Sequence, residues 1–209
     1  MTNLTLIRHG ETAWNAEGRV QGQTDVPLNA VGRAQAQALV AALEGERFDA
    51  VYSSDLARVV ETARPASTRL GMTPVLDAAL RERHYGMFET LTYVECRQRH
   101  PEAFARFSAK DPAFDFGSGE RLDAFFERSV ASVRAIAERH PGARVLVFTH
   151  GGVLEMLRRE AHGMGLSAPR DFDIPNAAIN RFTFEGGAWR MQAWAEIAHL
   201  ESALDDLRD

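Results

Sequence analysis

The sequence predicts an α/β fold, a three-layer α/β/α sandwich in which helices cover both faces of a mostly parallel sheet. Short apolar runs alternate along the chain with segments whose apolar residues recur at helical spacing, and this alternation is typical of parallel strands joined by crossover helices. Near the C-terminus, residues 180–184 and 190–194 instead flank Glu185-Gly186-Gly187. Two runs joined by such a turn indicate a hairpin, so we expect an antiparallel edge on the sheet.

The N-terminal part of the chain supplies two strand and helix pairs. Residues 4–7 are an apolar run of strand length, and the helical stripe after them opens at Asn29, a residue type that favours helix N-termini. Residues 50–53 are a second such run, and the helix that follows should end before Gly71. These two units predict two strands of the parallel sheet.

The rest of the chain continues the alternation. Residues 75–76 are a short third strand, residues 92–107 form a helical segment rich in aromatic side chains, and residues 119–140 form the clearest helix. A strand over residues 145–148 follows, and Val153 lies in the helical stripe after it. Ligands of such sheets bind beyond the carboxyl ends of the strands, so we expect a site at that edge.

Length, charge and cysteine content exclude several classes of protein. The 209 residues fit one domain, 1–209, and a net charge of −5 without a long basic run argues against nucleic acid as a partner. Cys96 is the only cysteine, which excludes an internal disulfide and a cysteine-based metal cluster. The apolar runs fall far short of the ~20 residues of a membrane span, so we expect no membrane partner and a cytoplasmic location.

Two of the expected strands end in a histidine followed by glycine. The first runs into Arg8-His9-Gly10, and the later one runs into Thr149-His150-Gly151-Gly152. Each histidine alone would more often be structural, but the same pair of residue types at two strand ends favours a shared site. Glycine lets the backbone approach a ligand, and the helix after His150 presents its N-terminus to an anion.

Arg58 adds a cation in the first turn of the helix that follows the second strand. The helix dipole disfavours positive charge there, so either an anion compensates for it or Arg58 pairs with the nearby Asp55. Two histidines and two arginines at one sheet edge favour a phosphoryl group as the ligand. Metal and serine-hydrolase sites have less support, because the chain has neither an HExxH nor a GxSxG motif.

Lysine is almost absent from the sequence. Lys110 is the only one, and the other 23 basic residues are arginine. It lies in the polar stretch 108–112, which lacks the glycine pattern of a phosphate-binding loop. Any chemistry that requires a lysine therefore has a single candidate.

Further motifs follow in order along nearly the whole chain. They are Leu6-Ile7-Arg8-His9-Gly10-Glu11-Thr12, Trp14-Asn15, Gly18-Arg19, Gln21-Gly22, Tyr52-Ser53-Ser54-Asp55-Leu56-Ala57-Arg58, Leu80-Arg81-Glu82, Gly119-Glu120, Thr149-His150-Gly151-Gly152 and Asn176-Ala177. With these motifs the chain resembles the histidine phosphatase superfamily, also called phosphoglycerate mutase-like. The resemblance implies the α/β fold expected above, with a helical cap segment at about residues 85–120.

The resemblance also implies roles for eight residues, and it implies neither a metal nor a cofactor. His9 would be the nucleophile that becomes a phosphohistidine, Glu82 the general acid, Arg8, Arg58 and His150 ligands of the phosphoryl oxygens, Asn15 and Gln21 further phosphate ligands, and Gly151 a backbone N–H donor. A histidine attacks phosphorus only as the neutral imidazole. We therefore expect the arginines to lower the pKa of His9, and its second ring nitrogen to donate to a backbone carbonyl.

The role of Glu82 has an alternative. Its neighbours Arg81, Arg83 and His84 make a surface ion pair credible. If Glu82 is not the acid, His84 is the next candidate on the same loop.

Three activities are compatible with these motifs. The expected one is a metal-independent phosphomonoesterase that acts on a small phosphorylated metabolite, and the alternatives are a cofactor-dependent phosphoglycerate mutase and a catalytically inactive phosphate-binding module. Residues 82–86 resemble the mutases, whereas Tyr93 replaces a substrate-binding lysine of the mutases and residues 114–121 resemble the phosphatases. His9 and Glu82 are both present, which argues against the inactive module. The balance favours the phosphatase.

The sequence fixes neither the natural substrate nor the oligomeric state. Aromatic residues of the cap segment favour a partly apolar substrate if they face the site, although core packing explains several of them equally well. These residues are Tyr85, Phe88, Tyr93, Phe104, Phe107, Phe114 and Phe116. Arg97, Arg99, His100 and Arg106 would favour an acidic substrate, although a solvated helix face is the simpler interpretation.

Overall fold

The sheet of the computed structural model, which describes residues 1–201, has six strands in the order β3-β2-β4-β1-β5-β6. The strands are β1 (Thr2–Arg8), β2 (Ala50–Ser53), β3 (Val75–Leu76), β4 (Arg144–Thr149), β5 (Ile179–Glu185) and β6 (Ala188–Glu196). Strands β1 to β4 run parallel, whereas β5 pairs antiparallel with both β1 and β6. The predicted parallel sheet with an antiparallel edge is confirmed.

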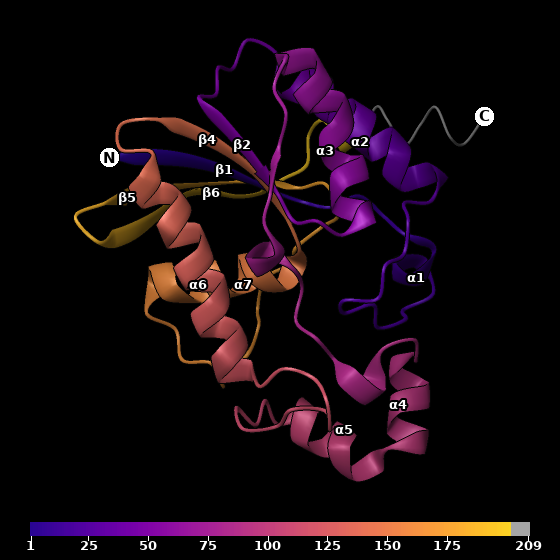
Figure 1. The fold of residues 1–209 in the computed structure, drawn as a ribbon. Coiled ribbons are helices and arrows are strands. Elements are labelled where there is room, and N and C mark those ends of the chain that lie inside the picture. The colour runs from indigo at the N-terminus through magenta and orange to yellow at the C-terminus, as the bar shows by residue number, and fades with distance from the viewer. Residues whose placement is uncertain (202–209) are drawn as a thin grey trace.

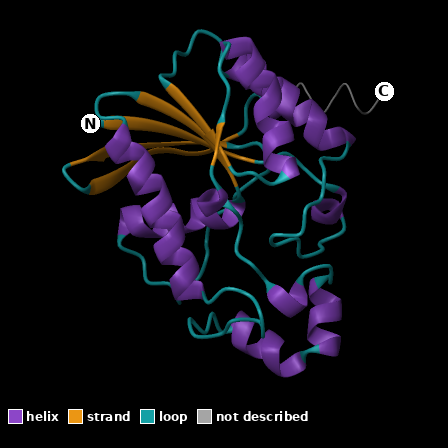
Figure 2. Ribbon diagram, viewed as in Figure 1, coloured by secondary structure: helices purple, strands orange, loops and turns teal. Residues whose placement is uncertain are grey.

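Helices lie on both faces of this sheet (Figure 1). They are α1 (Ala13–Ala16), α2 (Ala30–Ala42), α3 (Ala57–Leu70), α4 (Tyr93–Arg99), α5 (Pro101–Ser108), α6 (Leu122–Arg139) and α7 (Gly151–His162), with two short 3-10 helices, η1 (Ala78–Leu80) and η2 (Gly86–Phe88). Figure 2 shows α2 and α3 on one side of the strands and α6 and α7 on the other. The three predicted layers are therefore present. Among the helices of residues 1–201, none is both long and apolar enough to cross a membrane.

Strand β4 shows how the sheet supplies both layers of the core. Val145 and Val147 pack with residues of α6 and α7, whereas Leu146 and Phe148 pack with residues of α2 and α3. All four side chains are fully buried. Because successive side chains of a strand point to opposite faces, a strand that is covered on both faces must be apolar at every position.

Local sequence signals set several helix ends. The Asn29 side chain accepts a hydrogen bond from the Gly32 backbone N–H at 2.8 Å, so α2 begins where the sequence predicts. Gly71 ends α3 in the left-handed conformation, with φ at 68°. Helix α6 begins at Leu122 and not at residue 119, because Arg121 before it has extended backbone angles, while the Glu120 backbone N–H bonds the distant His84 carbonyl.

Residues 85–120 form a separate region, whose helices α4 and α5 lie apart from the sheet (Figure 1). The helical segment expected over residues 92–107 is present, as two helices and not one continuous helix. His100 leaves the helical conformation, and Pro101 starts α5 because its missing N–H is tolerated in a first turn. Much of the aromatic content of this region is core, since Phe88, Phe114 and Phe116 are buried in one cluster.

Candidate functional site

The carboxyl ends of β1 and β4 lie side by side and bring the two histidines together. Arg8 is opposite Thr149 in the parallel register, and the His9 backbone N–H donates to the Thr149 carbonyl oxygen at 2.9 Å. The His9 and His150 rings lie edge to face, with 5.2 Å between their centroids. The two strand ends therefore carry one cluster of side chains, as the sequence predicts.

His9 is held in one tautomer. Its Nδ1 lies 2.7 Å from the Gly10 carbonyl oxygen. Because a carbonyl can only accept, Nδ1 carries the proton and Nε2 of the neutral ring keeps its lone pair. Burial lowers the pKa of His9 well below its ordinary value, and the positive charges of Arg58 and Arg8 lower it further. The neutral imidazole is thus favoured, with burial and not the arginines as the main cause.

Arg58 does not pair with Asp55, so that alternative is wrong. Asp55 accepts two hydrogen bonds from Arg81, at 2.6 and 2.7 Å. The fully buried Arg58 guanidinium donates instead to the carbonyl oxygens of Gly22 and Thr24, at 2.7 and 3.0 Å. Burial lowers the pKa of Arg58 to about 10, which leaves it cationic near neutral pH.

Arg8 is the second cation beside His9. One of its terminal nitrogens donates to the Ile174 carbonyl oxygen. Its Nε is enclosed without a hydrogen-bond partner, and so is the Nε of Arg58. Within residues 1–201 neither guanidinium forms an ion pair with a carboxylate. The charge of Glu82 offsets the burial of both only in part. A desolvated cation that no carboxylate contacts is costly, so the arrangement is suited to an anionic ligand.

His150 lies behind these groups. Its Nδ1 is 3.3 Å from a terminal nitrogen of Arg58, and its Nε2 is 2.9 Å from Ser54 Oγ. Since the guanidinium can only donate, Nδ1 accepts its hydrogen bond. Nε2 therefore carries the ring proton and donates a hydrogen bond to Ser54 Oγ. Both ring nitrogens are therefore engaged, and His150 reaches a ligand oxygen only by exchanging one of these bonds. Burial, followed by the charge of Arg58, lowers the pKa of His150 well below its ordinary value.

Thr12 connects the two amide side chains of the site. Its hydroxyl lies 2.9 Å from Gln21 Oε1 and 3.1 Å from Asn15 Oδ1, and its backbone N–H also donates to Asn15 Oδ1. With both amide oxygens engaged, the NH₂ groups of Asn15 and Gln21 are the ends left to donate to an anion.

Glu82 reaches the cluster from the loop after η1. Its carboxylate accepts the Arg83 backbone N–H at 2.8 Å and the Gly152 backbone N–H at 2.9 Å. The Arg81 side chain is bound to Asp55, and the Arg83 side chain donates to main-chain carbonyls. Glu82 is therefore not part of the surface ion pair considered from the sequence.

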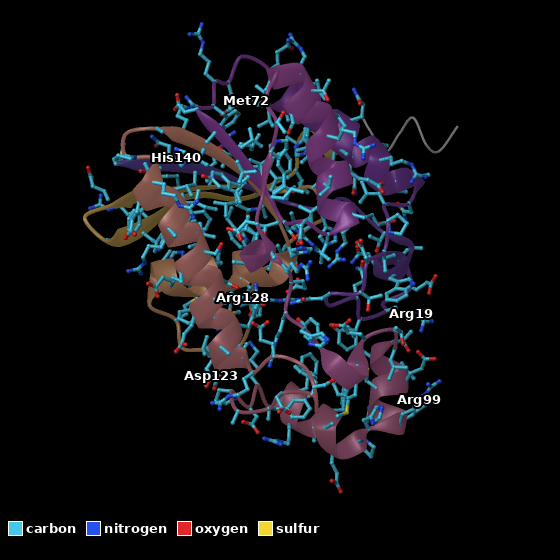
Figure 3. The ribbon with its side chains drawn as sticks, viewed as in Figure 1. Arg19, Met72, Arg99, Asp123, Arg128 and His140 are labelled. Carbon is cyan, nitrogen blue, oxygen red and sulfur yellow. The ribbon has the colours of Figure 1, made fainter. Side chains whose placement is uncertain are left out.

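Arg128, labelled on α6 in Figure 3, holds this loop in place. Its guanidinium donates to the carbonyl oxygens of Ala79 and Arg81 at 2.8 and 2.9 Å. It also makes two hydrogen bonds of 2.8 Å to the Glu120 carboxylate. Helix α6 thus fixes the segment that carries Glu82.

These side chains surround a cavity of about 250 Å³, the His9 cavity. Seven of the eight predicted residues line it, namely Arg8, His9, Asn15, Gln21, Arg58, Glu82 and Gly151, whereas His150 and the reserve acid His84 do not. Gly151 is the first residue of α7, whose N-terminus favours an anion. In residues 1–201 no three or more His, Cys, Asp or Glu side chains are grouped so as to hold a metal ion.

A second cavity of about 530 Å³, the adjoining chamber, opens beside the first. Tyr85, Tyr93, Gly152, Glu155 and Arg170 line both. The other walls of the chamber come from Arg83, from residues 107–110, from α6 and from α7 with the loop after it. Arg97, Arg99, His100 and Arg106, the cations that the sequence offered for an acidic substrate, line neither cavity.

Sequence reasoning assigned no role to Thr12, Gly152 or Arg128. Thr12 and Gly152 stand inside recognised motifs, so their positions were visible but their contacts were not. Arg128 is one of many arginines on a helix, and nothing in the local pattern distinguishes it. A Cβ built on Gly152 would lie 2.0 Å from Glu82 Oε1, which explains why glycine is needed there.

The comparisons with known proteins agree with this geometry. The family model of the histidine phosphatase superfamily (branch 1) matches residues 4–197. The chain is 41% identical over 202 residues to phosphoglycerate mutase-like protein 4 of Arabidopsis thaliana, a match that covers 95% of this chain and 86% of the relative. It is 37% identical over 205 residues to a metal-independent phosphoserine phosphatase of the same plant, covering 97% and 84%.

A solved structure gives the same result in three dimensions. A phosphoserine phosphatase mutant from Entamoeba histolytica, crystallised in complex with phosphoserine, superposes with a TM-score of 0.85 at 26% identity. The match covers 96% of this chain and 100% of that one. On the family match, the curated relatives and this fold, the chain belongs to the histidine phosphatase superfamily.

Proposed function

We propose that this chain is a phosphomonoesterase that works through a phosphohistidine on His9. The observation that carries the proposal is the His9 cavity, where a neutral imidazole with a free Nε2 lies beside the buried guanidinium of Arg58 and the half-buried one of Arg8, neither of which has a carboxylate partner. That combination fits a nucleophile and a binding site for a phosphate dianion. Relatives named as phosphoserine phosphatases support the same activity.

In the first step His9 Nε2 attacks phosphorus, and the bond from phosphorus to the ester oxygen breaks. The departing oxygen takes a proton from the carboxyl group of Glu82. Arg8 and Arg58 balance the charge on the phosphoryl oxygens, together with the amides of Asn15 and Gln21 and the backbone N–H of Gly151. His150 orients Arg58 and joins the phosphoryl ligands if its ring exchanges one of its present bonds.

In the second step water attacks the phosphohistidine. Its proton passes to the Glu82 carboxylate, phosphate leaves, and Nε2 regains its lone pair. The Gly10 carbonyl holds the proton on Nδ1 throughout, so the imidazole returns to the reactive tautomer.

Hydrolysis is favoured over mutase chemistry by the wall of the cavity. Tyr93, which stands where the mutases carry a lysine, lines the His9 cavity together with Tyr85. The name of the plant mutase-like relative keeps phosphoryl transfer to a second hydroxyl as the alternative. We further propose that residues 1–209 act as one domain in which residues 85–120 cap the site, and that the protein works in the cytoplasm without a metal or cofactor.

A hydrolysis assay tests the function. p-Nitrophenyl phosphate should be hydrolysed equally with and without 2,3-bisphosphoglycerate, whereas a mutase would show isomerisation of phosphoglycerate that depends on the bisphosphate. EDTA should leave the rate unchanged, and vanadate should inhibit because its trigonal bipyramid resembles the in-line transition state. Loss of activity in EDTA with recovery in Mg²⁺ or Zn²⁺ would refute the metal-independent mechanism.

A further inference from the structure

The adjoining chamber is larger than the His9 cavity and differs from it in character. Its volume is about 530 Å³, within the range of pockets that hold the body of a small molecule. Phe107, Leu122, Phe125 and Leu166 give it apolar walls. It adjoins the His9 cavity, with which it shares Tyr85 and Tyr93 as walls. A phosphoryl group bound beside His9 would therefore leave the rest of the ester in this chamber.

Lys110, the only lysine of the chain, lines this chamber. Its half-buried side chain extends from the turn after α5 to the loop after α7, where Nζ donates to the Ala168 carbonyl oxygen at 2.7 Å. An ammonium group has three donors, so two remain for another acceptor. Burial lowers the pKa of Lys110, which indicates that the ammonium has lost part of its hydration.

The one carboxylate among the chamber-lining residues is already committed. Glu155 accepts hydrogen bonds of 2.7 and 3.0 Å from the buried Arg159 and lies 3.5 Å from a nitrogen of Arg170. Within residues 1–201 Lys110 forms no ion pair. Arg83 and Arg170 are further cations of the chamber wall, but Arg83 donates to two main-chain carbonyl oxygens and Arg170 lies beside Glu155. Lys110 is thus a partly desolvated cation against aromatic and aliphatic walls, without a carboxylate of its own.

We infer that the Lys110 ammonium group binds an acidic group on the leaving alcohol of the substrate. The preferred substrates are then phosphomonoesters whose alcohol has an apolar, ring-sized body and carries a carboxylate on the side away from the ester oxygen. This inference rests on the phosphatase function proposed above, since it assigns the chamber to the alcohol of the substrate at His9.

Matched substrate pairs test the inference. Phenyl phosphates that carry a carboxylate or a carboxymethyl group at ring position 3 or 4 are compared with the corresponding neutral amides, which have nearly the same shape. In the best pair kcat/KM should favour the acid by about 10- to 100-fold, the range of a charge-assisted hydrogen bond. Lys110→Met should reduce that ratio at least about fivefold, and Lys110→Arg should retain more of it.

Two controls distinguish recognition of the substrate carboxylate by Lys110 from a general loss of activity or of positive charge. Arg99→Met removes an equal charge from α4 at an exposed side chain outside both cavities (Figure 3), and it should leave the ratio unchanged. Acetylation of the folded wild-type protein neutralises Lys110 and the N-terminal amine, and it should lower the ratio as Lys110→Met does. The same treatment of Lys110→Met, which leaves only the amine to react, should change nothing.

The outcomes distinguish this inference from the function on which it rests. Hydrolysis of acids and amides at equal efficiency, or a preference for acids that survives both Lys110→Met and acetylation, overturns the role of Lys110 and leaves the phosphatase intact. Failure of the wild-type protein to hydrolyse any of these esters or p-nitrophenyl phosphate overturns the phosphatase itself.

Discussion

The His9 cavity and the adjoining chamber are built in different ways. In the first, Arg8 and His9 stand at the end of β1 and Gly151 just beyond β4, and loop residues complete the wall. The His9 backbone is tied to the sheet by its hydrogen bond to Thr149. The second is enclosed by helices and loops that are far apart in the sequence, with Lys110 bonded to Ala168 across it. The comparison separates a fixed reaction centre from a recognition surface that can vary without disturbing the sheet.

The largest effect should come from Glu82, which belongs to the reaction centre. Glu82→Gln removes the proton donor but preserves the shape of the side chain. Phosphohistidine formation from an alkyl phosphate, measured in a single turnover, should slow by roughly 10² to 10⁴. With p-nitrophenyl phosphate it should slow much less, because that leaving group needs no protonation.

His84→Gln is the matched control for this change, since His84 lies on the same loop but faces Glu89 at 3.6 Å. It should affect both substrates little. Equal losses for the two esters in Glu82→Gln would make Glu82 a positioning residue and direct the search for the acid to His84.

The rate of phosphohistidine formation should fall less when the Glu82 carboxylate is displaced than when its proton is removed. In Gly152→Ala the new Cβ would lie 2.0 Å from Glu82 Oε1, so the carboxylate must shift although alanine suits a helix. The same alkyl-phosphate rate should fall by about 10- to 100-fold, on the scale of a misplaced catalytic group. Gly165→Ala is the control, because its Cβ would meet nothing within 4 Å. A Gly152→Ala protein with the wild-type rate would show that catalysis does not depend on the present position of the Glu82 carboxylate.

The chamber should respond to a change that leaves the reaction centre alone. Leu166 lines the chamber and not the His9 cavity. Leu166→Trp should lower kcat/KM for 1-naphthyl phosphate about tenfold, because the indole ring fills space that the bulky alcohol occupies. For methyl phosphate kcat/KM should stay within about twofold of the wild-type value, because its small alcohol does not reach that space. Leu166→Met, which conserves volume, should change neither. Equal losses for both esters would mean that the two cavities are not independent.

The smallest effect concerns stability against pH. The pKa values of His9 and His150 lie well below the ordinary value in the folded protein, mainly through burial. As the pH falls below about 6.5, the unfolded chain binds these protons first, so stability is lost through the window down to the lowered pKa values. Each imidazole contributes a slope of up to about 1.4 kcal/mol per pH unit in that window.

Urea unfolding at pH 7.5 and pH 5.5 measures this slope. His9→Asn should make the acid loss of stability shallower, whereas His162→Asn at an exposed position should not. A wild-type protein that gains stability on acidification would contradict the neutral, buried state of these histidines.

How far the sequence predicts each region follows from this difference in construction. The strand-end rule alone finds Arg8, His9 and His150, because a strand end is visible as the end of an apolar run. Arg58 stands out as a cation in a first turn. The pattern by itself does not place Glu82, whose bond to the Gly152 backbone joins residues 70 positions apart, and only the family resemblance identified it.

The sequence likewise predicts the elements of the fold that depend on local pattern, and it misses those that depend on contacts between distant residues. Each strand and the hairpin follow from apolar periodicity, whereas the break at His100 and the late start of α6 depend on contacts that periodicity does not contain. The chamber lies furthest from sequence reasoning. Three of the seven aromatic residues in question, Tyr85, Tyr93 and Phe107, line it, while Phe88, Phe114 and Phe116 are core. Nothing in their spacing separates the two groups.

The central claim is that His9 carries the phosphoryl group, and trapping that intermediate tests it most directly. The wild-type protein is mixed with a ³²P-labelled phosphomonoester, quenched in alkali within the first turnover and digested. The label should be stable to alkali and labile to acid, as a phosphoramidate is, and should map to the peptide that contains His9. It should be absent from His9→Ala. Label on His150, on serine or on a carboxylate would contradict the account.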